Sequence, residues 1–221
     1  MIKRIIFTIA VFAVFVQIAS SCCGPAQWEG YESVSSGLQF NGTGTEGIGL
    51  LNMSVDANIN KVAIKGYSMW NGQRVKQHNL YDYSAGKSYS VYNGKCLKAD
   101  LSPYPSPGKI NCVPSDAKLV LSTYYGTGDN KYEIDVYEYM IDGKKMELSV
   151  NKGSCLPVGQ HQQITNGFAD IGFMGITEGI KDPSVFDIPP ECNNAGTVSP
   201  VSKKLMHIHV FENIERGMFS N

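Results

Sequence analysis

The chain has 221 residues, of which 43% are hydrophobic and 18% charged. Its aromatic and β-branched residues are numerous enough to build a buried core, which excludes a disordered chain, and neither the Gly-X-Y period of collagen nor a heptad run is present. Because nucleic-acid-binding proteins carry a basic surface, the formal net charge of −1 argues against a nucleic-acid partner.

Residues 1–21 have the pattern of a secretory signal peptide. Lys3 and Arg4 are followed by the apolar stretch 5–16, and small residues lie immediately before Cys22. The apolar stretch is shorter than the roughly 20 residues that span a membrane, and no second one follows. We therefore expect a secreted, extracellular protein that begins at Cys22 and has no membrane span. A bacterial lipoprotein signal, which also ends before a cysteine, is the alternative, although its usual leucine is missing.

Alternation of apolar and polar residues dominates the rest of the chain and predicts β-strands. In chain order, the predicted strands cover residues 31–40, 48–55, 61–67, 75–83, 87–92, 118–125, 132–137, 145–150 and 163–177. Asp142-Gly143 predicts a tight hairpin, residues 56–60 predict another, and Asn-Gly pairs mark further turns. Roughly nine to eleven short strands separated by such turns are typical of a sandwich or a barrel. An all-β fold follows.

Two segments do not follow the strand pattern. The three prolines within 103–108 predict an irregular surface loop, because proline cannot join a sheet ladder. After Cys192 the chain has the composition of a linker, so we expect one domain over residues 22–192 and a tail over residues 193–221. Within that tail, residues 203–216 fit either a helix or a strand, and we expect a short C-terminal helix.

All cysteines lie after the signal peptide, at Cys22, Cys23, Cys96, Cys112, Cys155 and Cys192. An even number in a secreted chain predicts three disulfides, for which about 15 pairings are open. Asn41-Gly-Thr and Asn52-Met-Ser are acceptor sequences for N-glycans. We expect both to be glycosylated.

The sequence offers little for catalysis. Ala85-Gly-Lys-Ser88 resembles the end of a phosphate-binding loop, but Tyr81 stands where the first glycine is required, so a turn between strands is the preferred interpretation. Neither the G-x-S-x-G elbow nor the H-E-x-x-H zinc motif occurs, and no pattern pairs two carboxylates for acid–base chemistry. We therefore expect no enzymatic activity.

Metal-site patterns are equally incomplete. Residues 56–67 begin like a calcium loop, yet Lys61 and Tyr67 stand where its glycine and final glutamate are required, so a hairpin turn is preferred. His207 and His209 lie close together without further ligands at zinc-site spacing, which favours surface histidines. No residue is assigned to a metal.

Several motifs resemble those of the ependymin-related protein family. Near the N-terminus, residues 22–30 are Cys-Cys-Gly-Pro-Ala-Gln-Trp-Glu-Gly. Near the C-terminus, residues 179–186 are Gly-Ile-Lys-Asp-Pro-Ser-Val-Phe, followed by Pro-Pro-Glu-Cys at 189–192. The middle landmarks are the Val55-Asp56 hairpin, Gly94-Lys95-Cys96 and Gly-Ser-Cys-Leu-Pro-Val at 153–158. The resemblance extends over residues 22–192.

The resemblance implies two stacked antiparallel sheets that curve into a half-barrel around an apolar pocket, similar to bacterial lipoprotein carriers. It also implies a non-catalytic, secreted or lysosomal glycoprotein that is homodimeric, binds calcium and is linked to cell–matrix adhesion. The implied disulfides are Cys22–Cys155 and Cys96–Cys192, which leaves Cys23 with Cys112. The family usually has a cysteine near His78 and a partner for it near the C-terminus, and this chain has neither.

The favoured function is the binding of a hydrophobic molecule, such as a lipid or fatty acid. Alternating strands give each sheet one apolar face, and two such faces held apart by curvature leave an apolar pocket. The residues expected to line the pocket are Phe40, Leu50, Val62, Ile64, Leu80, Val91, Leu121, Ile134, Val136, Leu148, Phe168 and Phe173. A fully packed sandwich is the structural alternative, and a calcium-dependent adhesion glycoprotein that binds the extracellular matrix is the functional one.

The segment 181–186 has two interpretations. Its proline and the nearby Cys192 predict a fixed loop in which Phe186 is an apolar plug. The alternative is a segment that edges the pocket or contacts a partner. We expect the structural role.

Overall fold

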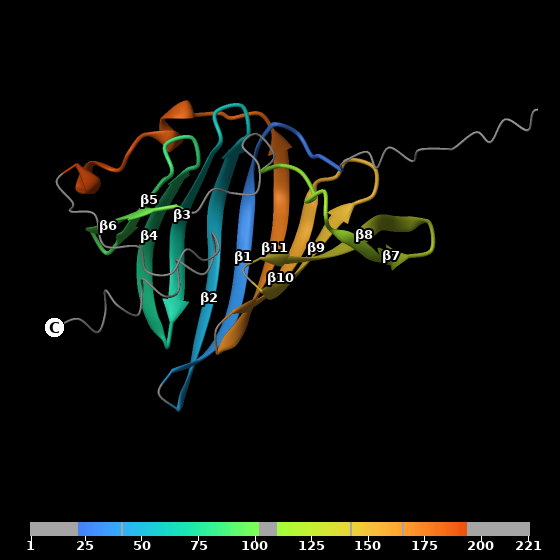
Figure 1. The fold of residues 1–221 in the computed structure, drawn as a ribbon, viewed down its shortest axis with the longest axis horizontal. Coiled ribbons are helices and arrows are strands. Elements are labelled where there is room, and N and C mark those ends of the chain that lie inside the picture. The colour runs from blue at the N-terminus through green and yellow to red at the C-terminus, as the bar shows by residue number, and fades with distance from the viewer. Residues whose placement is uncertain (1–21, 41, 102–109, 142, 165, 194–221) are drawn as a thin grey trace, which may run out of the picture.

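The computed structural model describes residues 22–40, 42–101, 110–141, 143–164 and 166–193. Strands in this part of the chain form one antiparallel sheet with the order β6-β5-β4-β3-β2-β1-β11-β10-β9-β8-β7 (Figure 1). In chain order they are β1 (Gln27–Phe40), β2 (Thr43–Asp56), β3 (Lys61–Trp70), β4 (Gln73–Asp82), β5 (Lys87–Tyr92), β6 (Lys95–Asp100), β7 (Lys118–Thr127), β8 (Asn130–Ile141), β9 (Lys144–Asn151), β10 (Pro157–Ile164) and β11 (Gly167–Glu178). Two short 3₁₀ helices follow, η1 (Pro183–Phe186) and η2 (Pro190–Cys192). Among the described residues, no helix has the length and apolar character to cross a membrane.

Strand β1 lies at the centre of the sheet because it pairs with β2 on one side and with β11 on the other. The connection from β6 to β7 therefore joins the two opposite edges. The sheet curves into an open half-barrel (Figure 1). The predicted all-β, curved antiparallel architecture is confirmed, with one refinement: the two expected sheets are continuous, since β1 and β11 hydrogen-bond directly.

Local turn sequences account for most of the meander. The two predicted hairpins are confirmed as the β2–β3 and β8–β9 pairs. Between β3 and β4, Asn71 and Gly72 have φ values of 46° and 78°, the positive values that type I′ turns require. Alternation does not indicate β10, because its centre is polar on both faces, and the predicted strand 163–177 is divided between β10 and β11. The expected loop at 103–108 and the expected C-terminal helix both lie outside the described residues.

Alternation along the strands places two apolar clusters on opposite faces of the sheet. The inner, concave face carries the larger cluster, which includes Trp28, Val62 and Ile64. The cluster on the outer face, called the outer cluster here, consists of Ala63, Leu80, Tyr89, Val91, Phe186 and Cys192. Phe186 is only 5% exposed, so η1 is held against the outer face. This position agrees with the apolar-plug interpretation of the segment 181–186.

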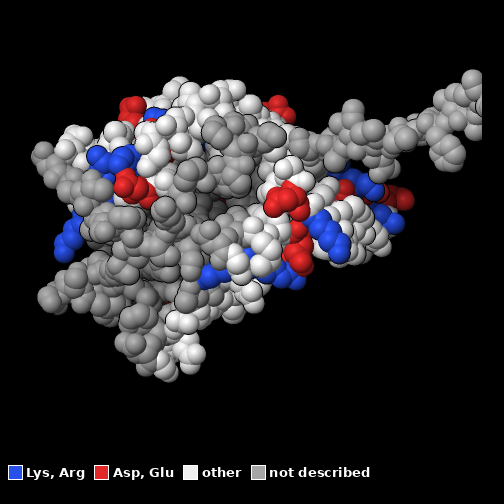
Figure 2. Space-filling model, viewed as in Figure 1, with Lys and Arg blue, Asp and Glu red and all other residues white. Residues whose placement is uncertain are grey.

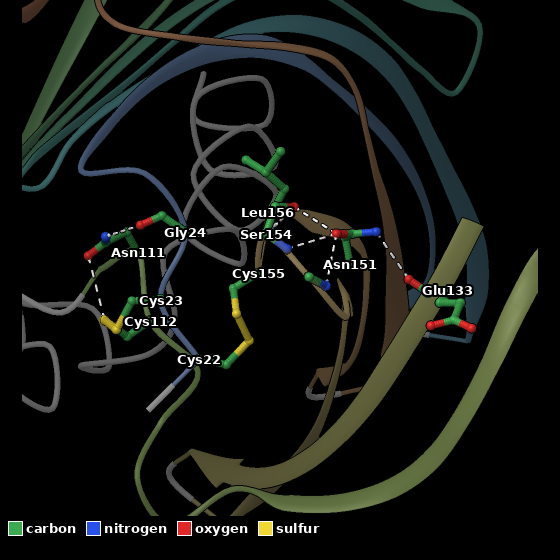
Figure 3. Close-up of a disulfide and its surroundings, with 11 residues drawn as sticks. Cys22, Cys23, Gly24, Asn111, Cys112, Glu133, Asn151, Ser154, Cys155 and Leu156 are labelled. Carbon is green, nitrogen blue, oxygen red and sulfur yellow. Dashed lines mark hydrogen bonds between the residues drawn. A yellow bond between two sulfur atoms is a disulfide. The ribbon is translucent and has the colours of Figure 1, made fainter. Parts of the chain in front are cut away.

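Three disulfides join distant parts of the chain: Cys22–Cys155, Cys23–Cys112 and Cys96–Cys192. These are the pairs that the resemblance implied. The first two tie the N-terminal segment to the turn before β10 and to the segment before β7, as Figure 3 shows. The third ties β6 to η2. Charged side chains of both signs are interspersed on the face shown in Figure 2.

Candidate hydrophobic-ligand site

The inner face contains a cavity of about 90 Å³ between the two halves of the sheet. One side is formed by β1, β2 and β3, the other by β8, β9, β10 and β11, and residues 110–113 also line it. Its apolar lining includes Trp28, Met53, Val55, Val62, Leu148 and Phe173. The volume equals that of about three water molecules at ~30 Å³ each. It is smaller than the roughly 300–1,000 Å³ of pockets that enclose a drug-sized ligand.

Strand register explains why these side chains meet. Trp28 pairs with Val55, and Val55 pairs with Val62, so three neighbouring strands place apolar side chains in one row of the inner face. From the far side of β1, the ring of Phe173 packs edge-on against Trp28, with ring centroids 6.3 Å apart. On β9, Leu148 lies two residues from Val150, and both line the cavity. The curvature of one sheet brings these side chains together.

The N-terminal segment and residues 110–113 close one end of the cavity. The Gly24 N–H donates to the Asn111 carbonyl at 2.8 Å, and the Asn111 side-chain amide donates to the Gly24 carbonyl at 2.7 Å (Figure 3). The Val113 N–H donates to the Cys22 carbonyl at 2.8 Å. Together with the disulfides of Cys22 and Cys23, these bonds attach the N-terminal segment to residues 110–113 and to the turn at Cys155.

Asn151 organises the turn that carries Cys155 to the cavity. Its side-chain oxygen accepts hydrogen bonds from the backbone N–H groups of Gly153 and Ser154, at 3.1 and 2.9 Å. Its amide nitrogen donates to the Glu133 carbonyl at 3.1 Å (Figure 3). The turn before β10 is thereby tied to β8, which positions the Cys22–Cys155 disulfide at the cavity wall.

Of the residues expected to line the pocket, the structure brings Val62, Leu148 and Phe173 to the cavity. Ile64 is buried in the inner cluster, and Ile134 is buried without lining the cavity. Val136 is half-buried and does not line it either. The side chain of Phe40 lies outside the described residues.

The remaining expected pocket residues require a correction. Leu80 and Val91 belong to the outer cluster, beneath η1 and η2. Leu50, Leu121 and Phe168 are exposed by 56%, 52% and 45%. The physical reason is that alternation separates the two faces of a strand but does not say which face the sheet curves toward.

Sequence reasoning missed other residues of the cavity, notably Trp28, Met53, Val55 and Val150. A usable signal existed for Val55, because the predicted hairpin at 56–60 places it opposite Val62. No local signal identifies residues 110–113, which reach the cavity through the long connection between opposite edges of the sheet.

Polar side chains are also buried on the inner face, one strand beyond the cavity. Gln77, Asn79 and Tyr81 alternate along β4 and are 2%, 0% and 0% exposed. Among the described residues, neither polar atom of the Asn79 amide has a hydrogen-bond partner, and the Gln77 side-chain oxygen and the Tyr81 hydroxyl also lack one. Each such group costs about 1–3 kcal/mol of stability. Burial raises the pKa of Tyr81 well above its usual value, and Tyr92, Tyr83 and Glu32 raise it further.

The other sequence candidates have structural explanations. In the calcium-like segment, the Asp56 carboxylate accepts hydrogen bonds from the Gln27 side chain at 2.7 Å and from the Asn58 N–H at 2.9 Å, as expected of a hairpin turn. In the phosphate-loop-like segment, Lys87 forms an ion pair with Asp100. Within the described ranges, no group of three His, Cys, Asp or Glu side chains is arranged to hold a metal ion. His207 and His209 lie outside those ranges.

Comparisons with known proteins place the chain in a family. The Ependymin family model matches residues 71–192. Ependymin-related protein 1 from Haliotis asinina is 27% identical over 190 residues, which cover 79% of this chain and 91% of that protein. Among solved structures, the chain is similar to LprF from Mycobacterium bovis, with 11% identity, a TM-score of 0.36 and coverage of 77% of this chain and 90% of that one. It is also similar to a LolA superfamily protein from Nitrosomonas europaea, with 8% identity, a TM-score of 0.29 and coverage of 73% and 90%. The match to more than half of its residues shows that the chain belongs to the ependymin family.

Proposed function

We propose that this ependymin-family protein binds a hydrophobic molecule, such as the acyl chain of a lipid, on the inner face of its sheet, and that it is not an enzyme. The observation that carries the proposal is the apolar cavity between the two halves of the sheet. An acyl chain that enters it gains roughly 0.8 kcal/mol per buried CH₂ group, before ordering costs. Because the cavity measures about 90 Å³, a long chain has to widen it.

The test is a titration of delipidated protein with a fluorescent fatty acid. We expect saturable binding that Leu148→Asp abolishes, since the substitution places a charge in the cavity wall. Leu50→Asp is the matched control, because Leu50 is 56% exposed on β2 and does not line the cavity. Circular dichroism establishes that both variants are folded. Absence of saturable binding to several lipid classes would refute the proposal.

Export through the secretory pathway is part of the proposal, with removal of residues 1–21 and an extracellular or lysosomal destination. Three disulfides support it, because such bonds persist in oxidising compartments. Asn52 is exposed on β2 and is proposed to carry an N-glycan, as is Asn41, which lies outside the described residues. Amidase release of glycans, followed by mass spectrometry of each Asn→Gln variant, tests the two sites.

We also propose that the chain forms a homodimer through β7. This edge strand pairs with β8 alone in the described sheet, and Leu119, Val120 and Leu121 are 49%, 46% and 52% exposed. An apolar edge strand is a template for pairing with a second copy. Sedimentation of the wild type and of Val120→Lys tests this face: the lysine variant should be monomeric at concentrations where the wild type is dimeric.

Calcium binding and cell–matrix adhesion remain proposals that rest on the resemblance alone, and they form the alternative function. The two functions predict different results. An adhesion glycoprotein should bind collagen or cells in a manner that a calcium chelator removes, whereas the lipid binder should retain its ligand in the chelator. Lipid extraction from protein purified without detergent, with and without the chelator, separates them.

A further inference from the structure

A strip of uncharged polar side chains lies beside the apolar cavity on the inner face. Gln77, Asn79 and Tyr81 come from alternate positions of β4, and Ser88 and Ser90 of β5 lie opposite Tyr81 and Asn79. All five are buried. We call these five residues the polar strip. Tyr81 in turn lies opposite Val62, which lines the cavity. Because neighbouring strands are about 4.8 Å apart, the strip begins one strand away from the apolar lining.

The strip has hydrogen-bonding capacity that the described residues do not use. The Asn79 amide offers two donors and a carbonyl acceptor, the Gln77 oxygen a further acceptor, and the Tyr81 hydroxyl both functions. None of these atoms has a partner among the described residues, and Asn79 and Tyr81 are fully buried. Buried polar groups are almost always paired in native proteins, so such a group points to a missing partner.

The charges around the strip select among possible partners. On β3 and β4, the basic residues Lys65, Lys76 and His78 alternate with the inner-facing residues and therefore belong to the outer face. Glu32 of β1 is 2% exposed and lies in register with Leu51 on the inner face. A carboxylate ligand would thus meet no buried cation in the strip and would approach the same face as Glu32. An uncharged head group avoids both the cost of burying an unpaired charge and the repulsion from the Glu32 carboxylate.

We infer that the polar strip binds the uncharged, hydroxyl- or amide-bearing head group of an amphiphile whose acyl chain enters the cavity. The inference rests on the proposed function and specifies its ligand class. A hydroxylated head group donates to the Gln77 oxygen and exchanges hydrogen bonds with the Asn79 amide and the Tyr81 hydroxyl. The ligand class is therefore a neutral lipid of the monoacylglycerol type, whereas a free fatty acid lacks the complementary donors at neutral pH.

The experiment compares probes with the same chain: 1-monolauroylglycerol and dodecanoic acid, each displacing an uncharged fluorescent dye at pH 7.5. We expect the monoacylglycerol to bind at least about tenfold more tightly. In Asn79→Leu this preference should disappear, because only the head-group contact is removed. The exposed Gln163→Leu is the matched control and should retain the preference.

A second measurement separates a binding role from a structural one. Replacing an unpaired buried amide with an apolar group of similar shape is neutral or stabilising. The melting temperature of ligand-free Asn79→Leu should therefore equal or exceed that of the wild type. A lower melting temperature would show that the amide has structural partners, such as ordered waters, and would overturn the inference.

The binding outcomes also distinguish the two proposals. If the dye and dodecanoic acid bind but the monoacylglycerol shows no preference, the head-group inference fails and the proposed function stands. If neither lipid nor the dye binds, the proposed function fails and this inference fails with it.

Discussion

Strands β4 and β7 reverse the usual relation between hydrophobicity and burial. From Gln77 to Asp82, β4 is largely polar, yet none of these residues is exposed. In contrast, β7 contains Leu119, Val120 and Leu121 in succession, and all ten of its residues are exposed. The difference lies in their neighbours. Strand β4 lies between β3 and β5, and Leu80 on its outer face packs with Phe186 of η1 and Cys192 of η2, whereas β7 is an edge strand. Position in the sheet decides which residues are buried.

The largest expected effect comes from removing the outer cover of β4. The double variant Cys96→Ser/Cys192→Ser opens a disulfide that spans 96 residues, and loss of such a constraint costs about 4 kcal/mol of unfolding free energy. Urea denaturation measures this loss. Amide exchange should accelerate in β4 and β5, while β7 should be unchanged. A loss below about 1 kcal/mol would mean that the outer cluster holds η2 without the disulfide.

A matched pair of leucine substitutions tests whether position in the sheet decides how much a side chain contributes to stability. Leu80 is fully buried on β4, whereas Leu121 is 52% exposed on β7. Leu80→Ala should lower the free energy of unfolding by about 2–5 kcal/mol, because it leaves a cavity in the outer cluster. Leu121→Ala should change it by less than about 0.5 kcal/mol. The measurement is made at a concentration where the protein is monomeric. Similar losses in the two variants would contradict the difference in burial between β4 and β7.

His78 makes the stability of the β4 region depend on pH. Burial lowers the pKa of His78 to about 4, with Lys65 acting in the same direction and Glu191 opposing it. The unfolded chain binds a proton at this residue below about pH 6.5, whereas the folded chain does not until about pH 4. Stability should therefore fall as the pH decreases from 6.5 to 4.

The measurement is the melting temperature against pH for the wild type and for His78→Gln. The variant should lose less stability over this interval, and parallel curves would exclude the contribution of His78. His161, which lies outside β4 and is paired with Asp170, provides the control variant His161→Gln.

The smallest expected effect concerns one hydroxyl group. Tyr81→Phe removes a buried hydroxyl that has no partner among the described residues, so the ligand-free protein should keep its stability or gain up to about 1 kcal/mol. Because the folded pKa of Tyr81 is raised, its contribution to stability is lost as the pH rises above about 10. Tyr81→Phe should reduce this alkaline loss. Tyr125→Phe, at a residue 56% exposed on β7, should leave the free energy of unfolding unchanged at neutral pH and above about pH 10.

Much of the local structure follows from short stretches of sequence. The alternation in β2, β3, β8 and β9 predicts strands, and the Asn71-Gly72 pair tolerates the positive φ values of a tight turn. The disulfide pairs follow from the family motifs. The site was less predictable: Val62 and Leu50 both lie in apolar runs of predicted strands, yet only Val62 reaches the cavity.

Short-range patterns in the sequence predict most of the strands, the two hairpins and the all-β class, because period-two patterning and turn conformation depend on residues close together in the chain. The tertiary structure, in contrast, joins the strands into one sheet through β1 and β11 and brings residues 110–113 to the cavity. It also decided that the polar side chains of β4 are buried while the leucines of β7 are exposed. Burial depends on curvature and on contacts between residues far apart in sequence, and no local pattern encodes either.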